Sequence, residues 1–324
     1  KRFYGQPVGE ILSTAGHRGI LRYHPTELVI TARSGTPLAE IETALAAQNQ
    51  MLAFEPPAFG AGATLGGTIA AGLSGPRRFS TGAARDFVLG VGCLNGRGEL
   101  LRFGGEVVKN VAGYDAARLM AGSWGTLAVL LDISLKVLPR PETELTVSLS
   151  LSPELALEQA NRLAGRPLPL TGAAYDGARL WLRLAGSGVG VAQARQIIAG
   201  DSESHGATFW QDLKEQRLAF FRDPRPLWRI AVAPATPPLA LAGDWFYDWG
   251  GALRWLKTER PAREIHAAAQ ERGGHARLFR GVTDAAGDSA APVLSPALAQ
   301  LHRRLKLAFD PHGILNPQRL APDW

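Results

Sequence analysis

The most informative stretch of the sequence reads Gly60-Ala-Gly-Ala-Thr64-Leu-Gly66-Gly67-Thr68-Ile-Ala-Ala-Gly72-Leu-Ser74-Gly75. These small residues carry hydroxyl groups but almost no side-chain bulk, so a ligand can approach the backbone closely. Backbone N–H groups in such a loop, joined to the start of a helix, can donate hydrogen bonds to a pyrophosphate. Glycine-rich loops also serve tight packing alone, and composition by itself leaves that alternative open.

The ordinary nucleotide-binding signatures are missing from this sequence. It contains no Gly-Lys dipeptide, which excludes a P-loop, and no G-x-G-x-x-G motif joins a strand to a helix. A cofactor bound by the glycine-rich tract must therefore be held in another way.

Alternating β and α patterns surround the tract. Residues 28–32 predict a strand, and Thr36-Pro37 then supplies an N-cap and a first-turn proline for a helix. Residues 87–94 and 99–103 flank Asn95-Gly96-Arg97-Gly98, which is typical of a β-hairpin. A short helix at 114–120 and a long strand at 127–137 complete this mixed region.

The proline-rich connector Pro139-Arg140-Pro141 separates a second region, because closely spaced prolines favour an extended linker. Residues 143–198 follow a β-α-β-β-α pattern, and residues 228–280 follow with strand, strand, helix and strand. Helices on one antiparallel sheet are typical of ferredoxin-like domains. The predicted domains are therefore 1–140, a cap at 141–284, and a C-terminal segment at 285–324 with a helix that begins at Ser295-Pro296.

The 35 basic and 29 acidic residues give a formal charge of +6, which is compatible with nucleic acid, anionic lipid or an acidic partner. The basic residues are scattered, and the densest cluster lies in the C-terminal helical pattern, whose apolar positions are Leu298, Leu301, Leu305 and Ala308. We therefore expect no nucleic acid partner, and a solvated helix face made of His302, Arg303, Arg304 and Lys306.

The single cysteine, Cys93, lies within the apolar run 87–94. It can form no internal disulfide and no iron–sulfur or zinc cage, so we expect no metal site and a reducing, cytoplasmic compartment. No stretch approaches the roughly 18 apolar residues of a membrane helix. The sequence begins at Lys1 without a signal-peptide pattern.

Four motifs in a fixed order carry a family resemblance. They read Gly62-Ala-Thr-Leu-Gly-Gly; Gly82-Ala-Ala-Arg85-Asp86-Phe-Val-Leu-Gly90; Lys109-Asn-Val-Ala-Gly113-Tyr114-Asp115 followed by Gly122-Ser123-Trp-Gly125-Thr-Leu-Ala-Val129; and Phe309-Asp-Pro-His-Gly-Ile-Leu-Asn316-Pro317. Together they resemble the FAD-binding domain of the vanillyl-alcohol oxidase and p-cresol methylhydroxylase (PCMH) type, in its D-lactate and glycolate dehydrogenase branch.

This resemblance implies an α+β fold, in which a two-subdomain PCMH-type FAD-binding domain carries a ferredoxin-like α+β cap and receives the C-terminal helix. It also implies that a further glycine- and serine-containing pyrophosphate loop would precede Lys1. Arg85 and Asp86 could equally form an ion pair that fixes their loop to the sheet, and Gly113, Tyr114 and Asp115 are expected to shape a turn and cap the helix that follows. The residues that the resemblance implies for FAD binding are Gly62, Ala63, Thr64, Gly66, Gly67, Ser74, Gly75, Arg85, Gly122, Gly125, Val129 and Asn316.

The resemblance further implies a function in a complex. A small 2-hydroxy acid, glycolate, would be oxidised to glyoxylate, and electrons would pass through the flavin to an iron–sulfur subunit. A larger FAD-binding subunit would be the second partner, and the complex could bring this chain to the inner face of the cell membrane. The catalytic large subunits of the branch use an H-x-G-D-G-N motif that this sequence lacks. The alternative is therefore a flavin-binding or scaffold subunit without catalysis of its own.

Two residues are candidates for direct chemistry. His275 could accept the hydroxyl proton as a base, or it could be a strand-edge histidine satisfied by backbone. Arg254 could clamp a substrate carboxylate, or it could be a surface arginine over Trp255. Trp245, Trp249 and Trp255 are of a type that more often anchors a core or an interface than lies beside a flavin, and with Phe246 and Tyr247 they suggest a subunit contact.

Overall fold

The computed structural model describes residues 9–106, 115–281 and 294–320. The chain divides into two compact units, which are described separately. The five-stranded unit consists of Tyr4–Gly75, Gly82–Arg140 and Leu294–Trp324, and the eight-stranded unit consists of Lys1–Phe3, Pro76–Thr81 and Pro141–Val293. In the part of the chain that the structure describes, no helix combines the length and apolarity that crossing a membrane requires.

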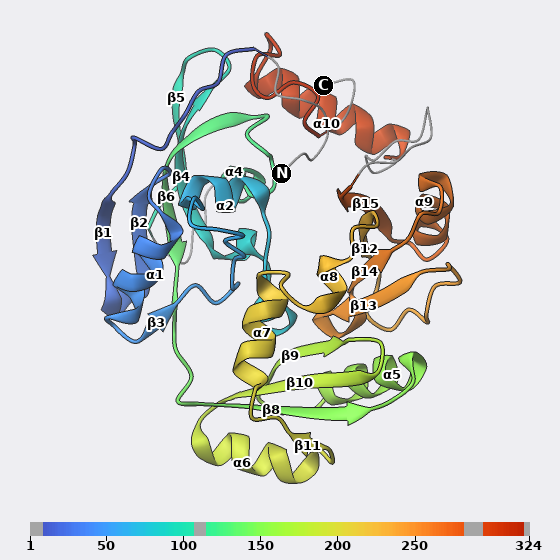
Figure 1. The fold of residues 1–324 in the computed structure, drawn as a ribbon. Helices are drawn as coiled ribbons and strands as arrows, with labels where there is room; N and C mark the ends of the chain where they lie inside the picture. The colour runs from blue at the N-terminus through green and yellow to red at the C-terminus, as the bar shows by residue number, and fades with distance from the viewer. Residues whose placement is uncertain (1–8, 107–114, 282–293, 321–324) are drawn as a thin grey trace. The chain divides into compact units, whose positions relative to one another are not determined.

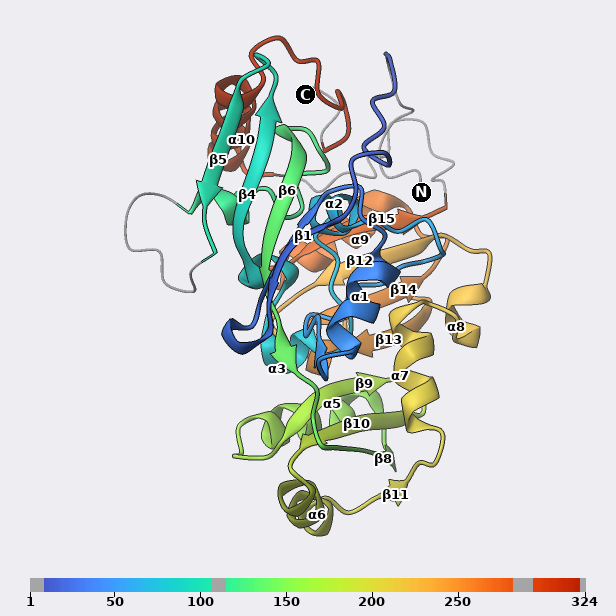
Figure 2. The ribbon, with the colours of Figure 1, turned by 90° about the vertical axis from the view of Figure 1, so that its left-hand side faces the viewer.

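An antiparallel sheet forms the centre of the five-stranded unit, and its strands lie side by side in Figure 2. The helices α1 (Leu38–Ala46) and α2 (Leu65–Ala71) and the short α4 (Ala116–Leu119) pack with it around one apolar core. The sheet order is β1 (Ile20–His24), β2 (Val29–Arg33), β6 (Ala128–Lys136), β4 (Val88–Asn95) and β5 (Leu100–Gly104). A two-stranded sheet pairs β3 (Gln50–Met51) with β7 (Leu138–Pro139).

The predicted hairpin and the predicted C-terminal helix are confirmed, whereas the predicted cap of α1 is wrong. The helix α1 follows Pro37, which makes no side-chain cap, and the Thr36 hydroxyl hydrogen-bonds the backbone of Gly19 instead. The C-terminal helix α10 (Pro296–Phe309) does begin with a serine cap, because Ser295 Oγ accepts from the Leu298 N–H. Its C-terminal end lies near β5, where the rings of Phe103 and Phe309 meet edge to face (Figure 2).

The eight-stranded unit joins two ferredoxin-like halves edge to edge (Figure 1). When the four strands of each half are numbered along the chain, both halves have the strand order 4-1-3-2 across the sheet. The halves meet at the second strand of each, where Tyr175 pairs with Tyr247. This confirms the ferredoxin-like prediction. The first half contains β8 (Thr143–Ser150), β9 (Leu170–Tyr175), β10 (Arg179–Gly186) and β11 (Asp201–Ser202), and the second contains β12 (Leu227–Ala231), β13 (Asp244–Asp248), β14 (Leu253–Lys257) and β15 (His275–Arg280).

Helices cover this sheet on both faces of its first half. α5 (Pro153–Ala164) and α6 (Gly188–Ile197) pack on the face that carries the leucines of β10, and α9 (Ala262–Gln270) covers the corresponding face of the second half. On the opposite face, α7 (Gly206–Lys214) places Phe209 in a stack with Trp181, at 4.0 Å between ring centroids. The second half has no helix between β12 and β13, where three prolines stand at positions 234, 237 and 238.

Most of the aromatic cluster that was expected at a subunit contact belongs to the core instead. Phe246, Tyr247, Trp249 and Trp255 are buried inside the eight-stranded unit, where β13 and β14 pair along their whole length, whereas Trp245 is half-buried. The subunit contact is therefore wrong for the four buried residues, and the core alternative is confirmed for Trp249 and Trp255. The sequence did not predict β13, the strand that carries Phe246 and Tyr247.

Cys93 should be unreactive in the folded protein. Its thiol is fully buried in β4, and desolvation, followed by the nearby negative charge of Asp132, raises its pKa to about 11. At pH 8 only about one thiol in a thousand would be the reactive thiolate. A thiol reagent added to native protein should therefore label Cys93 only at the rate of unfolding. Rapid labelling before unfolding would contradict this burial.

Candidate cofactor site

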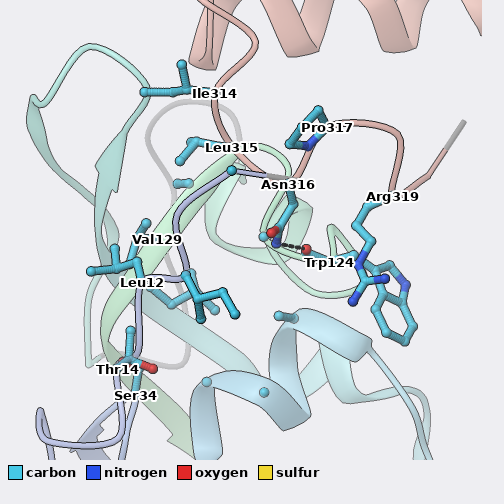
Figure 3. Close-up of a pocket in the computed structure, with 18 of the residues that line it drawn as sticks. Leu12, Thr14, Ser34, Trp124, Val129, Ile314, Leu315, Asn316, Pro317 and Arg319 are labelled. Atoms are coloured by element: carbon cyan, nitrogen blue, oxygen red, sulfur yellow. Dashed lines mark hydrogen bonds between the residues drawn. The ribbon is translucent and has the colours of Figure 1, made fainter. Parts of the chain in front are cut away.

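A cavity of about 400 Å³ opens on the five-stranded unit. Five segments line it: the extended chain before β1, the end of β2, the start of β6 with the turn before it, α2, and the loop after α10 (Figure 3). The size is within the range of small-molecule and cofactor sites. The lining residues are Gly9, Glu10, Ile11, Leu12, Thr14, Ser34, Gly66, Gly67, Ala70, Trp124, Gly125, Ala128, Val129, Leu130, Ile314, Leu315, Asn316, Pro317 and Arg319.

The glycine-rich tract contributes a helix face without side-chain bulk. Gly66, Gly67 and Ala70 line the cavity from α2. A Cβ atom on Gly66 would lie 2.7 Å from the Cβ of Ser34, so only glycine allows α2 to approach β2 this closely. A Cβ on Gly67 would meet only the Thr64 hydroxyl, at 3.2 Å, which leaves space on the cavity side.

The expectation that free N–H groups start this helix is wrong. The amides of Leu65 and Gly66 donate to the carbonyls of Thr36 and Ser34, at 2.9 and 2.7 Å. The N–H groups of Gly67 and Thr68 donate to Thr64, to its side-chain and backbone oxygens respectively. The first turn of α2 thus satisfies its own donors, and its contribution to a ligand is close approach.

One buried hydroxyl in the cavity wall lacks a partner. Among the residues that the structure describes, Ser34 Oγ makes no hydrogen bond although the residue is buried. Buried polar groups are normally paired, so an orphaned hydroxyl in a cavity wall indicates a partner supplied by a ligand. This observation fits a cofactor rich in hydroxyl and phosphate oxygens, such as FAD.

A strained turn and the C-terminal loop form the opposite wall. Trp124 adopts a left-handed φ of 56°, its N–H donates to the carbonyl of Ala70 on α2, and its carbonyl accepts from Asn316 Nδ2 at 2.7 Å (Figure 3). Gly125 has φ 68°, and a Cβ there would lie 2.8 Å from Asn316 Nδ2. Position 125 therefore requires glycine both for its backbone and for the approach of Asn316.

Seven predicted cofactor residues lie outside the cavity lining. Gly62 is exposed, the Ala63 carbonyl accepts from Leu38, and Thr64 caps α2. The Ser74 hydroxyl, the Gly75 amide and the Gly122 amide are engaged by Ala84, Phe54 and Ile69, respectively. Arg85 is exposed and lies 3.9 Å from Asp86, which matches the ion-pair alternative. The five that do line the cavity are Gly66, Gly67, Gly125, Val129 and Asn316.

Several cavity residues were not predicted from the sequence. Ile11 and Leu12 are apolar and 84% and 71% exposed. Both residues lie outside the family motifs, and no other feature of the sequence indicates that they line a cofactor cavity. Trp124 and Ile314 did stand inside quoted motifs, where only their neighbours were singled out. Ser34 precedes the predicted helix start and could have been found only from the packing of β2 against α2.

The two catalytic candidates lie in the eight-stranded unit. Arg254 is fully buried on β14, and its guanidinium donates to the carbonyls of Gly251 (3.1 Å), Pro237 (2.8 Å) and Thr236. Its Cζ lies 5.0 Å from the ring centroid of Tyr247, so the alternative of a surface arginine over Trp255 is wrong.

His275 is exposed at the start of the edge strand β15. Desolvation of the ring lowers its pKa, and the positive charges of Arg229 and Arg277 lower it further. Among the described residues no carboxylate hydrogen-bonds this ring. The lowered pKa favours the neutral imidazole, but within the part of the chain that the structure describes no carboxylate holds the ring in the orientation of a base.

Comparisons with known proteins agree with this geometry. A model of the FAD binding domain family matches residues 3–104, and one of the C-terminal domain of FAD linked oxidases matches residues 293–320. The cavity is lined from both matched segments. A solved structure of alkyldihydroxyacetonephosphate synthase has a TM-score of 0.62 at 17% identity, over 94% of this chain and 67% of that one, which shows the shared fold.

Two bacterial proteins are similar to this chain, one over a short segment and one over nearly its whole length. The glycolate oxidase subunit GlcD of Bacillus subtilis (strain 168) is 40% identical over 84 residues, which are 26% of this chain and 18% of that protein. The glycolate oxidase subunit GlcE of Escherichia coli (strain K12) is 48% identical over 321 residues, which are 99% of this chain and 90% of that protein. The predicted α+β fold and FAD-binding domain are confirmed, and the chain belongs to the GlcE family of glycolate oxidase subunits.

Proposed function

We propose that this chain is the FAD-binding subunit of a complex that oxidises glycolate to glyoxylate, and that the cavity of the five-stranded unit holds the FAD. One observation supports this location of the FAD. Residues from the glycine-rich tract, the 122–129 motif and the C-terminal motif line a single cavity, whose wall contains the unpartnered Ser34 hydroxyl.

The residues of the cavity have separable tasks in this proposal. Gly67 lets the cofactor approach α2 without side-chain obstruction, Gly66 lets α2 pack closely on Ser34, and the Ser34 hydroxyl offers the cofactor a hydrogen bond. Ile11, Leu12 and Ile314 are exposed apolar side chains at the cavity, which would exclude water once a ligand covers them. Bound FAD supplies the capacity to accept a hydride from the substrate carbon, and the protein supplies orientation and electrostatics.

A second candidate is that this chain binds flavin while another subunit carries out substrate oxidation. Its support is the state of the two catalytic candidates. Arg254 is committed to three backbone carbonyls, and His275 has no orienting carboxylate among the described residues. We therefore place turnover in the complex, with a larger FAD-binding subunit and an iron–sulfur subunit as partners. Any association with the inner face of the cell membrane would then depend on those partners.

Anaerobic addition of glycolate separates the two candidates. The full-length chain, loaded with FAD, should keep its flavin absorbance when glycolate is added, whereas the complex should be bleached. Bleaching of the isolated chain would show that it is catalytic by itself. A complex whose flavin is bleached equally with this subunit omitted would contradict its role in glycolate oxidation.

Ser34→Ala should weaken FAD binding while preserving the fold. Alanine removes only the hydroxyl group and adds no atom to a tightly packed position, and the loss of an unpaired buried hydroxyl should leave stability unchanged or slightly higher. The lost hydrogen bond to the cofactor should raise the Kd for FAD about tenfold. Titration followed by flavin fluorescence measures the Kd, and thermal unfolding without FAD controls for stability. An unchanged Kd would show that Ser34 makes no contact with the cofactor.

A further inference from the structure

The helix α10 is attached to its unit through a lysine. The sequence predicts a solvated face made of His302, Arg303, Arg304 and Lys306; Arg303 and Arg304 are exposed as predicted, but Lys306 is buried. Lys306 is only 6% exposed and is the buried residue of α10, whereas Leu298 and Leu301 are 48% and 52% exposed. A lysine is almost never buried unless it is paired, so its position calls for a specific function.

All three donors of the Lys306 ammonium are used. Nζ donates to Asp310 Oδ2 at 2.6 Å, to the Thr126 carbonyl at 2.8 Å and to the Leu315 carbonyl at 2.8 Å. An ammonium has three donors in total, so this geometry satisfies it completely. Lys306 thereby joins the helix to a turn 180 residues earlier in the chain and to the loop that follows the helix.

Asp310 completes the arrangement from the end of the helix. It is almost fully buried, and its carboxylate accepts from the amides of Leu315 (2.8 Å) and Ile314 (3.2 Å) as well as from Lys306. Burial raises the pKa of this carboxyl, but the Lys306 ammonium and the two amides outweigh that effect and lower it. A Cβ on Gly96, in the β4–β5 turn, would lie 2.2 Å from Asp310 Oδ1, so glycine makes room for the carboxylate.

Both segments held by Lys306 carry cavity residues. Thr126 follows Trp124 and Gly125, which line the cavity, and Leu315 lies between Ile314 and Asn316, which also line it. The hydrogen bond from Asn316 to the Trp124 carbonyl joins the same two segments at the cavity surface. Lys306 therefore connects them from the buried side, and Asn316 connects them from the side of the ligand.

We propose that Lys306 and Asp310 are positioning residues that fix the Trp124–Thr126 turn and the Ile314–Pro317 loop as one preformed wall of the FAD cavity. This inference rests on the proposed location of FAD. A wall held before binding need not be ordered by the ligand, so the cofactor is retained more tightly. Breaking the connection should speed FAD release without removing any group that touches the cofactor.

The double variant Lys306→Met/Asp310→Asn tests this role. It leaves no buried uncompensated charge, and asparagine keeps an acceptor for the loop amides, so the chain should fold. Losing the bonds to Thr126 and Leu315 should speed FAD dissociation at least about tenfold. The flavin visible circular dichroism should change as well, because the cofactor environment loosens. Stopped-flow release of FAD from the loaded full-length chain measures the rate.

Two controls separate positioning from general destabilisation. Arg260→Met/Glu264→Gln removes an ion pair of the same i,i+4 spacing in the other unit, between Arg260, just before α9, and Glu264 in its first turn. It should release FAD at the wild-type rate. Leu45→Ala lowers the stability of the same unit from a core position outside the cavity. If Leu45→Ala speeds FAD release and alters the flavin spectrum as much as the double variant does, the positioning role is overturned.

Amide hydrogen exchange tests the preformed wall in the wild-type chain. The amides of Ile314 and Leu315 should be protected even without FAD, because Asp310 already accepts from both. Exchange of these amides at the rate of an open chain until FAD is added would overturn the proposal. A wild-type chain that binds no FAD at all would instead contradict the proposed function.

Discussion

Gly67→Leu should leave the five-stranded unit folded and weaken FAD binding by about 100-fold or more. Gly67 is exposed on α2 at the cavity, and an added Cβ would meet only the Thr64 hydroxyl at 3.2 Å. A leucine is also a better helix former than glycine, so the free energy of unfolding should change little. Its side chain would occupy cavity volume, and overpacking of about 3 kcal/mol corresponds to the expected loss.

Gly62→Leu is the matched control for this variant. Gly62 belongs to the same tract, carries the same residue change, and has open space around its Cβ position outside the cavity lining. Its Kd for FAD should stay within about twofold to threefold of the wild-type value, a change of well under 1 kcal/mol. Equal losses in the two variants would place the cofactor along the loop and not in the cavity.

Arg254→Met should lower the free energy of unfolding of the eight-stranded unit by about 3 kcal/mol or more. The variant leaves the buried carbonyls of Gly251 and Thr236 without their donor, and each buried unsatisfied group costs about 1–3 kcal/mol. The Pro237 carbonyl, in an exposed residue, loses its donor at a smaller cost. It also removes the contact of the guanidinium with the Tyr247 ring. Chemical denaturation followed by tryptophan fluorescence measures the change.

An exposed arginine provides the comparison for Arg254. Arg260→Met removes an arginine that is half exposed on the surface, and it should change stability by less than about 0.5 kcal/mol. If Arg254 instead binds the substrate carboxylate, a different result is expected. Unchanged stability of Arg254→Met together with a raised KM of the complex for glycolate would favour the clamp and contradict a structural role.

The sequence predicted the elements with strong periodicity or turn chemistry. The β4–β5 hairpin follows from Asn95-Gly96-Arg97-Gly98, and the two ferredoxin-like halves follow from alternating strands separated by helical patterns. It could not predict β13, because Asp244–Asp248 is short and nearly all aromatic, without a period of two. Only the pairing of this strand with β14 and β9 explains its burial.

The candidate site was predictable in part for a similar reason. The motifs mark positions where the backbone must carry no side chain, and in this way they identify Gly66, Gly67 and Gly125 as cavity residues. They do not reveal which side chains from distant segments complete the cavity, as Ser34 does.

The C-terminal helix shows the same limit most clearly. Apolar spacing predicted its leucines inside, but the buried position is taken by Lys306, whose partners at Thr126 and Asp310 only the folded chain brings together. A prediction from helical periodicity places a lysine on the solvent-exposed face. In this helix the hydrogen bond of Lys306 to the distant Thr126 buries the side chain instead.

The flavin content of the purified full-length chain tests the central claim most directly. After gel filtration in the presence of FAD and removal of the unbound cofactor, the wild-type chain should carry equimolar FAD, and Gly67→Leu should carry almost none. A colourless wild-type chain would contradict the account, and so would a Gly67→Leu chain that keeps as much flavin as the wild type.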